Sequence, residues 1–77
     1  MEFQYVNSSN VDRIGYDVIT GRLHVIFKGS GIEHVYDGVE SEKYEELVNS
    51  PSKGRFLNDD IKPNYQHYAL SPGGKGD

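Results

Sequence analysis

Apolar and polar residues alternate along residues 11 to 39, and the alternation stops at two short turn sequences. These sequences are Thr20-Gly21 and Gly29-Ser30-Gly31. Alternation is typical of a half-buried strand, because successive side chains of a strand point to opposite faces, and small turn-forming residues are typical of the link between strands. The pattern therefore predicts a three-stranded antiparallel meander. Residues 2 to 6 are a candidate for an N-terminal edge strand.

The first turn predicts how the first two strands pair. A two-residue turn at Thr20-Gly21 places Val18 opposite Leu23. The same register brings Tyr16 opposite Val25 and unites the apolar side chains on one face. We expect this register because a slip by one residue would expose a whole row of apolar side chains.

The second turn predicts where the central aromatic residues point. An even loop with Ser30-Gly31 at its tip pairs Phe27 with His34 and keeps the apolar face intact. The aromatic centre of the chain, which consists of Tyr16, His34 and Tyr36, then points into the core. A buried tyrosine ring fills volume there while its hydroxyl reaches a partner at the rim.

Beyond the meander, the apolar residues follow a helical period. Tyr44, Leu47 and Val48 are spaced at i, i+3 and i+4, which predicts an amphipathic helix. Ser41 is suited to begin this helix as its N-cap, and Pro51 ends it because the residue before a proline disfavours helical geometry.

A second short helix is predicted from Ser52 to Asn58. Leu57, Ile61 and Tyr65 follow one another at intervals of four and extend its apolar stripe, although Pro63 limits the regularity of the extension. The predicted fold class is α+β, with both short C-terminal helices packed on one face of the sheet and the other face left to water.

Length and composition narrow the class of protein. The 77 residues predict a single domain over residues 1–70, and residues 71–77, with one proline and three glycines, are predicted to form a disordered tail. The chain has no cysteine, which excludes a disulfide scaffold and a cysteine-based zinc site. No apolar run approaches the ~20 residues that span a bilayer. We expect a cytoplasmic protein without a cofactor and without a membrane partner.

The formal net charge of −4 disfavours long-range attraction of nucleic acid, so any nucleic-acid site must be a local patch. One such patch is predicted at the start of the second helix. Ser52-Lys53-Gly54-Arg55 combines a hydroxyl, backbone donors and two cations, a set suited to hold a phosphate or carboxylate, and Lys62 and Tyr65 could extend it. Helix capping and packing are the alternative explanation of the same residues.

A second candidate site lies on the open face of the sheet. The expected register places Asp17, His24 and Asp37 in one cross-strand row. An imidazole between two carboxylates could bind a divalent metal or relay a proton. An ordinary surface charge network explains the row more simply, because exposed ion pairs are common and individually weak. We therefore predict no metal site.

Nucleophilic catalysis finds no support in the chain. There is no cysteine, no Gly-x-Ser-x-Gly segment, and no serine and acid at a matching distance from the histidines. We expect a protein that is not an enzyme.

One ordered series of residues runs through all the predicted elements. It consists of Ser8-Ser9, Ile14-Gly15-Tyr16-Asp17, Leu23, Val25, Phe27, Tyr36, Val39, Tyr44, Leu47, Ser52, Gly54, Phe56, Ile61 and Tyr65. Together these residues resemble the KTSC family, named for a short domain at the C terminus of some lysyl-tRNA synthetases and also found as small stand-alone bacterial and phage proteins. The resemblance covers residues 8 to 65, and His34 stands where the family usually has the first tyrosine of its central pair.

The resemblance implies RNA binding through the synthetase context of the family. Sheets that bind RNA display aromatic side chains on the open face, whereas the expected open face here holds only Ile26 and Val35 as apolar residues. We therefore expect RNA, or another phosphate-bearing ligand, at Lys53, Arg55 and Lys62. The alternative is a protein-interaction module, a phage or bacterial regulator, that uses a sheet edge or the open sheet face.

Overall fold

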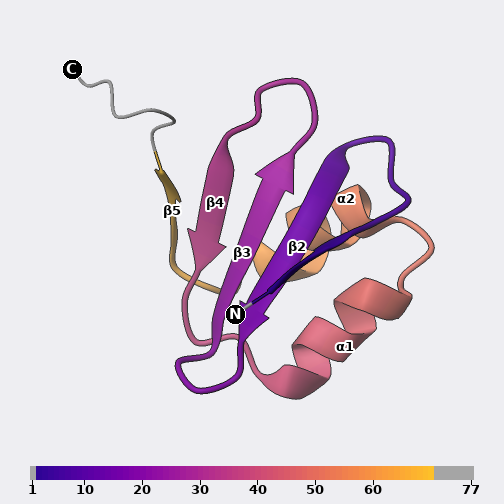
Figure 1. Ribbon diagram of the computed structural model, residues 1–77. Helices are drawn as coiled ribbons and strands as arrows, with labels where there is room; N and C mark the ends of the chain where they lie inside the picture. The colour runs from indigo at the N-terminus through magenta and orange to yellow at the C-terminus, as the bar shows by residue number, and fades with distance from the viewer. Residues whose placement is uncertain (1, 71–77) are drawn as a thin grey trace.

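The computed structural model describes residues 2–70, so the predicted disordered tail at residues 71–77 lies outside the described residues. The described chain is an α+β domain with five strands, two helices and one π-helical turn (Figure 1). In chain order the elements are β1 (Phe3–Tyr5), β2 (Val11–Asp17), β3 (Arg22–Phe27), β4 (Glu33–Tyr36), α1 (Ser41–Asn49), α2 (Lys53–Phe56), η1 (Leu57–Ile61) and β5 (His67–Leu70). The strands form one antiparallel sheet in the order β1-β2-β3-β4-β5.

The expected three-stranded sheet is therefore corrected to five strands. The N-terminal candidate strand is present as β1, whereas β5 is unexpected. After both helices the chain returns to the sheet, and β5 pairs with β4 so that His34 lies opposite Ala69. A strand of four residues is too short to display a convincing alternation. Its formation depends on contact with the exposed edge of β4.

The first turn is longer than predicted, and this shifts the register by two residues. The Asp17 carboxylate accepts hydrogen bonds from the backbone N–H groups of Ile19 (3.0 Å) and Thr20 (3.4 Å), and Gly21 donates to the Asp17 carbonyl (2.8 Å). Asp side chains commonly stabilise turns in this way. Val18 is therefore a turn residue with 77% of its surface exposed, instead of a core residue.

The strand pairs shift accordingly, but the faces do not. Leu23 pairs with Tyr16 and with Tyr36. The second loop likewise holds four residues, closed by a hydrogen bond from Gly31 N–H to the Phe27 carbonyl (3.0 Å). Because both loops have an even length, the aromatic centre still lies on the inner face, as predicted.

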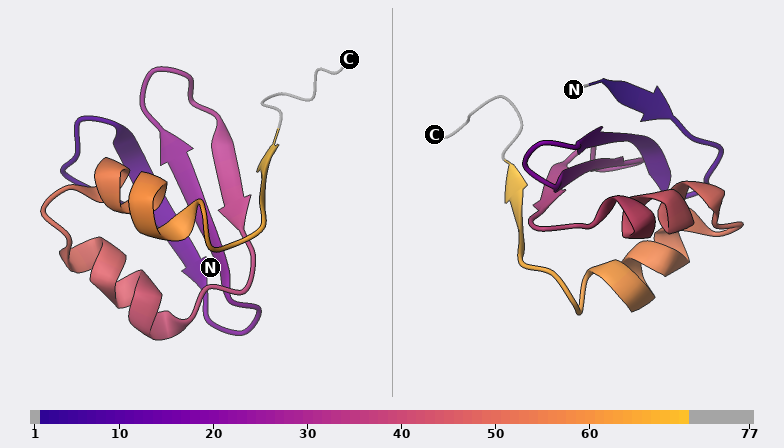
Figure 2. Two further views of the ribbon diagram at one scale, coloured as in Figure 1. Left: turned by 180° about the vertical axis from the view of Figure 1, so that it is seen from behind. Right: turned by 90° about the horizontal axis from the view of Figure 1, so that it is seen from below.

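Both helices cover the inner face of the sheet, as the two views of Figure 2 show. The core consists of Val11, Ile14, Leu23, Val25, Tyr36, Val39, Leu47, Leu57 and Ile61. Leu57 and Ile61 are buried in the core and Tyr65 packs against the core, which confirms the predicted stripe. The helix ends at η1, where Lys62 N–H donates to the Leu57 carbonyl (2.7 Å), because Pro63 has no N–H to continue the ladder.

Candidate functional site

A groove of about 470 Å³ lies on the helix-covered side of the sheet. Strands β4 and β5 form one wall, α2 and η1 form the other, and the loop after β3 adds to its rim. We call it the Tyr36 groove. Its polar lining consists mainly of Lys28, His34, Tyr36, Asn58, Lys62 and His67.

The groove is positively charged within an acidic protein. Its lining includes two lysines and two histidines but no Asp or Glu. Within residues 2–70, Lys28 and Lys62 have no ion-pair partner. The other cations of this segment are paired with carboxylates, apart from Lys53; the pairs are Arg13–Asp12, Arg22–Asp37, Lys43–Glu46 and Arg55–Asp59. Uncompensated positive charge therefore gathers at the groove.

Tyr36 lines the groove with a side chain that is otherwise largely buried. The residue is 3% exposed, and its hydroxyl has no hydrogen-bond partner among the described residues. Burial raises the pKa of this phenol, so it remains a neutral donor. The ring of His67 stacks on it, with the ring centres 5.1 Å apart and the planes at 29°. The hydroxyl is not among the buried polar atoms that lack a partner, so it is accessible and is suited to donate to a ligand.

His34 lies beside Tyr36 on the inner face and is half-buried. Its ring meets that of Phe27 edge to face, with the centres 5.0 Å apart. Burial lowers the pKa of His34, and the nearby His67 and Lys62 lower it further. An anion in the groove would oppose these effects and favour the protonated imidazole.

The predicted helix-start site is divided by the structure. Gly54 and Lys62 line the Tyr36 groove. Lys53 instead donates from Nζ to the Ser50 carbonyl at 2.9 Å. Arg55, whose side chain is 82% exposed, lies 3.7 Å from Asp59.

Ser52 and Tyr65, also predicted for this site, have structural contacts. Ser52 is the N-cap residue of α2, but its side chain makes no capping hydrogen bond. The Tyr65 hydroxyl donates to the Glu40 carboxylate. This hydrogen bond raises the pKa of Tyr65 to about 12 and lowers the pKa of Glu40. Tyr65 is therefore committed to Glu40 instead of facing the groove.

The KTSC family model matches residues 7–65, which include most of the groove and the whole aromatic centre. The chain belongs to the KTSC family. A protein of Tsukamurella paurometabola is 36% identical over 67 residues, which cover 87% of this chain and 98% of that protein. The crystal structure of the KTSC domain protein YPO2434 from Yersinia pestis superposes with a TM-score of 0.84 at 30% identity, covering 91% of this chain and 97% of the other.

The aromatic centre of this KTSC domain serves two purposes. Tyr16 stacks on Tyr44 with ring centres 4.4 Å apart, and its hydroxyl donates to the Val39 carbonyl at 2.5 Å. Burial is the main cause that raises the pKa of Tyr16. Tyr16 therefore connects the sheet to α1 and to Val39. His34 and Tyr36 instead line the groove.

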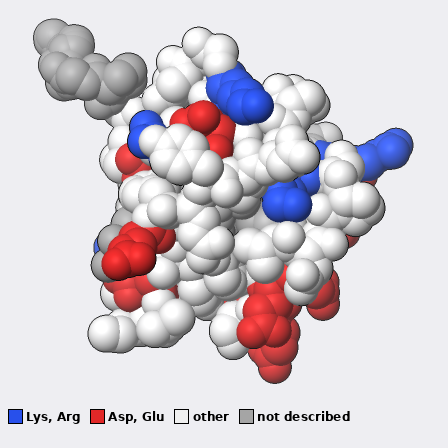
Figure 3. All heavy atoms as spheres, turned by 45° about the vertical axis from the view of Figure 1, so that its right-hand side comes forward, with Lys and Arg blue, Asp and Glu red and all other residues white. Residues whose placement is uncertain are grey.

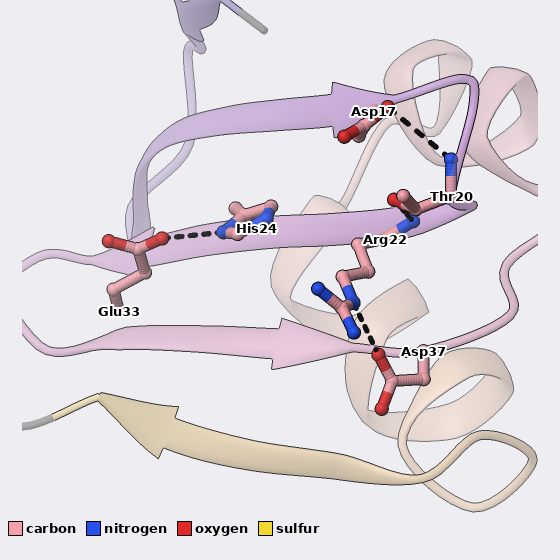
Figure 4. Close-up of polar contacts among 6 residues, drawn as sticks. All are labelled: Asp17, Thr20, Arg22, His24, Glu33 and Asp37. Atoms are coloured by element: carbon pink, nitrogen blue, oxygen red, sulfur yellow. Dashed lines mark hydrogen bonds and ion pairs between the residues drawn. The ribbon is translucent and has the colours of Figure 1, made fainter.

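The predicted row of Asp17, His24 and Asp37 is corrected by the register (Figure 4). Arg22 lies between the two aspartates, and its Nε is 3.2 Å from Asp37. Backbone hydrogen bonds from the turn lower the pKa of Asp17. Within residues 2–70, no group of three His, Asp or Glu side chains is placed to hold a metal ion.

His24 lies in the neighbouring row, between Gly15 and Val35. Its Nδ1 is 2.6 Å from a carboxylate oxygen of Glu33, as Figure 4 shows. Phe3 meets the His24 ring edge to face at 6.1 Å. These contacts occupy the imidazole with structural partners.

The open face is more apolar than the sequence predicted. The two edge strands add Phe3 and Tyr5 from β1 and Tyr68 and Leu70 from β5 to this face. Tyr5 is 73% exposed, whereas Val35, expected to be accessible, is 1% exposed. The expectation of an open face without aromatic residues was therefore wrong.

The sequence interpretation missed Lys28 and His67 as groove residues. Lys28 lies in the loop directly after β3. His67 was not assigned to a strand, because residues 67–70 are too few to display a convincing alternation. No helix within residues 2–70 has the length and apolar character needed to cross a membrane.

Proposed function

We propose that this KTSC domain is a non-enzymatic module that binds a phosphate-bearing ligand in the Tyr36 groove, with single-stranded nucleic acid as the favoured class. One observation carries the proposal: Lys28 and Lys62, which have no ion-pair partner in the described chain, line a groove without carboxylates. Lysine is a common phosphate ligand, and a local cationic site can overcome an acidic net charge at short range.

The remaining lining is consistent with this ligand. Tyr36 offers a hydroxyl donor without a partner, and the aromatic faces of Phe27 and His67 are of the type on which nucleic-acid bases stack. The loop before β2 can lie close to α2 because residue 54 is a glycine. A Cβ at Gly54 would lie 2.9 Å from the Asn10 amide nitrogen, so a larger residue would push Asn10 away from the groove wall.

The helix start alone supports the proposal less well. Arg55 and Lys53 already have partners. Of the residues predicted for the helix-start site, Gly54 and Lys62 line the groove, and Lys28 lines it as well.

The test is fluorescence anisotropy with a labelled single-stranded RNA at several salt concentrations. Each phosphate contact on a single strand contributes a slope of about −0.7 to the plot of log affinity against log salt. In the Lys28→Ala, Lys62→Ala variant we expect binding to weaken about tenfold and the slope to become less steep by about 1.4.

The matched control is Lys53→Ala, Arg55→Ala, which removes the same charge at the helix start. We expect it to bind within about twofold of the original chain, because a general loss of charge at this distance is screened by salt. The reverse result, with the control pair losing binding and the groove pair retaining it, would place the ligand at the helix start.

A second candidate function is protein interaction through the open sheet face. Tyr5, Tyr68 and Leu70 expose large apolar surfaces from the two edge strands. Sedimentation equilibrium of the original chain and of Tyr5→Ser, Tyr68→Ser tests this candidate for self-association. If both proteins are monomers at all concentrations, this result would argue against self-association through the open face.

A further inference from the structure

We infer that the Tyr36 groove holds one nucleotide that ends in a phosphate monoester, either a free nucleoside monophosphate or the phosphorylated end of a single strand, and does not hold an internal stretch of a strand. This inference rests on the proposed function and specifies its ligand.

The size of the groove suits one such unit. Its volume of about 470 Å³ lies in the range of about 300–1,000 Å³ that is typical of sites for a single small ligand. The lining also offers two kinds of contact in one place. Lys28 and Lys62 provide charge, while Phe27 and His67 provide aromatic surface.

The charge of the groove matches a terminal phosphate. A phosphate monoester carries about −1.5 to −2 charges at neutral pH, whereas an internal phosphodiester carries a single charge. Two lysines without carboxylate partners neutralise one monoester. In the described chain, no third unpaired cation lines the groove to receive the next phosphate.

The surfaces of α1 and η1 oppose a strand that continues beyond the groove in their direction. Another hollow on the helix side, about 550 Å³ in volume, is lined by Glu42, Glu45 and Glu46. Figure 3 shows acidic side chains gathered at the lower edge of that view, on the side where α1 lies. Asp60, which has no ion-pair partner within residues 2–70, adds negative charge to η1. Phosphates that left the groove along α1 or η1 would be repelled.

The position of His67 indicates the role of the base. One face of the ring stacks on Tyr36, and the residue itself is exposed at the groove. The other ring face is suited to receive a planar base. Tyr36 then supports the stack from below and presents its hydroxyl to the same ligand.

The experiment compares ligands by isothermal titration calorimetry on the full chain. The ligands are adenosine monophosphate, adenosine, inorganic phosphate, a 5′-phosphorylated single-stranded oligonucleotide, and the same oligonucleotide closed into a circle. We expect the monophosphate and the phosphorylated linear strand to bind with similar affinity. Adenosine, inorganic phosphate and the circle should each bind at least about tenfold more weakly, because each lacks either the base or the monoester.

Variants separate the base contact from the charge contact. Loss of one stacked base costs roughly 5- to 150-fold in affinity, so His67→Ala should weaken the monophosphate by a factor in this range and leave inorganic phosphate unchanged. His67→Phe should restore binding. Lys28→Ala, Lys62→Ala should weaken the monophosphate and inorganic phosphate alike.

The failures of the two proposals are distinguishable. Equal binding of the linear and circular strands, with both weakened by Lys28→Ala, Lys62→Ala, would overturn the one-nucleotide inference and leave the groove as a nucleic-acid site. Equal binding of inorganic phosphate and the monophosphate would overturn the base contact. If no phosphate-bearing ligand binds, or if the lysine variant binds all of them as the original chain does, the proposed function fails as well.

Discussion

The two faces of the sheet carry similar residue types but use them differently. On the open face, basic side chains lie beside acids, as in Arg22–Asp37 and His24–Glu33. On the helix-covered face, the groove collects Lys28 and Lys62 without a carboxylate. Paired surface charges contribute little and attract no ligand, whereas uncompensated charge beside apolar surface is available for binding. The pairing of charges, more than their number, therefore marks the candidate site.

The same contrast holds for the tyrosines. Tyr16 and Tyr65 each donate a hydrogen bond to a partner across the fold, the Val39 carbonyl and the Glu40 carboxylate. Tyr36 is more deeply buried than either, yet its hydroxyl has no partner in the described chain. Mutation can therefore distinguish the tyrosine hydroxyls that stabilise the fold from the Tyr36 hydroxyl, which we propose binds a ligand.

The largest expected effect is the difference in stability loss between truncating a leucine on the inner face of the sheet and truncating one on the open face. Leu23→Ala removes a fully buried side chain between sheet and helices and should lower the free energy of unfolding by about 2–5 kcal/mol. Leu70→Ala, at an exposed position of the open face, should change it by about 0.5 kcal/mol or less. Urea denaturation followed by circular dichroism provides both values. Equal losses would show that the β5 edge is as important to the core as β3.

A smaller effect separates the two central tyrosines. Tyr16→Phe removes the hydrogen bond to Val39 and should lower the free energy of unfolding by about 1 kcal/mol. Tyr36→Phe removes a hydroxyl without a partner, so stability should remain within about 0.5 kcal/mol. Only Tyr36→Phe should weaken the binding of adenosine monophosphate. If Tyr36→Phe proves the more destabilising of the two, its hydroxyl has a structural role and the comparison fails.

The smallest effect is the pH dependence that His34 contributes. Its pKa in the folded chain lies below the ordinary value of 6.5, mainly because of burial, so the unfolded chain binds the proton more readily. This contribution to stability is complete above pH 6.5 and is lost as the pH falls through the folded pKa. Denaturation at several pH values should show the loss in the original chain and less of it in His34→Gln.

The same histidine reports on the groove. Addition of adenosine monophosphate should raise the pKa of His34, because an anion favours the protonated ring. An NMR titration of the His34 ring protons with and without the nucleotide measures this change. An unchanged pKa in the presence of saturating nucleotide would place the phosphate away from this residue.

Much of the fold could be predicted because strand alternation is a local property. Tyr16 and Tyr36 were assigned to the inner face, and they lie there, although the pairing itself was wrong by two residues. An even change in loop length moves the partner and preserves the face. The stripe from Leu57 to Ile61 was likewise readable, because helical spacing determines which side chains share a side.

The groove was less predictable because its residues meet through pairings of distant segments. Lys28 reached it through a loop whose length depends on Gly31 and Phe27, and His67 reached it through β5. No local pattern brings residues 28, 62 and 67 together. Asp17 illustrates the same limit on a smaller scale. The sequence suggested a cross-strand row with His24 and Asp37, but the Asp17 carboxylate instead accepts hydrogen bonds from the turn that follows β2.

The sequence by itself determined the family, the α+β class and the inward direction of the aromatic centre, because alternation, helical period and turn residues act within a few positions of the chain. Only the tertiary structure determined the strand register, the presence of the fifth strand, and which lysines remain without an ion-pair partner. These features depend on loop lengths and on contacts between segments that lie far apart in sequence. Such contacts place Lys28, Lys62 and His67 around the unpartnered hydroxyl of Tyr36.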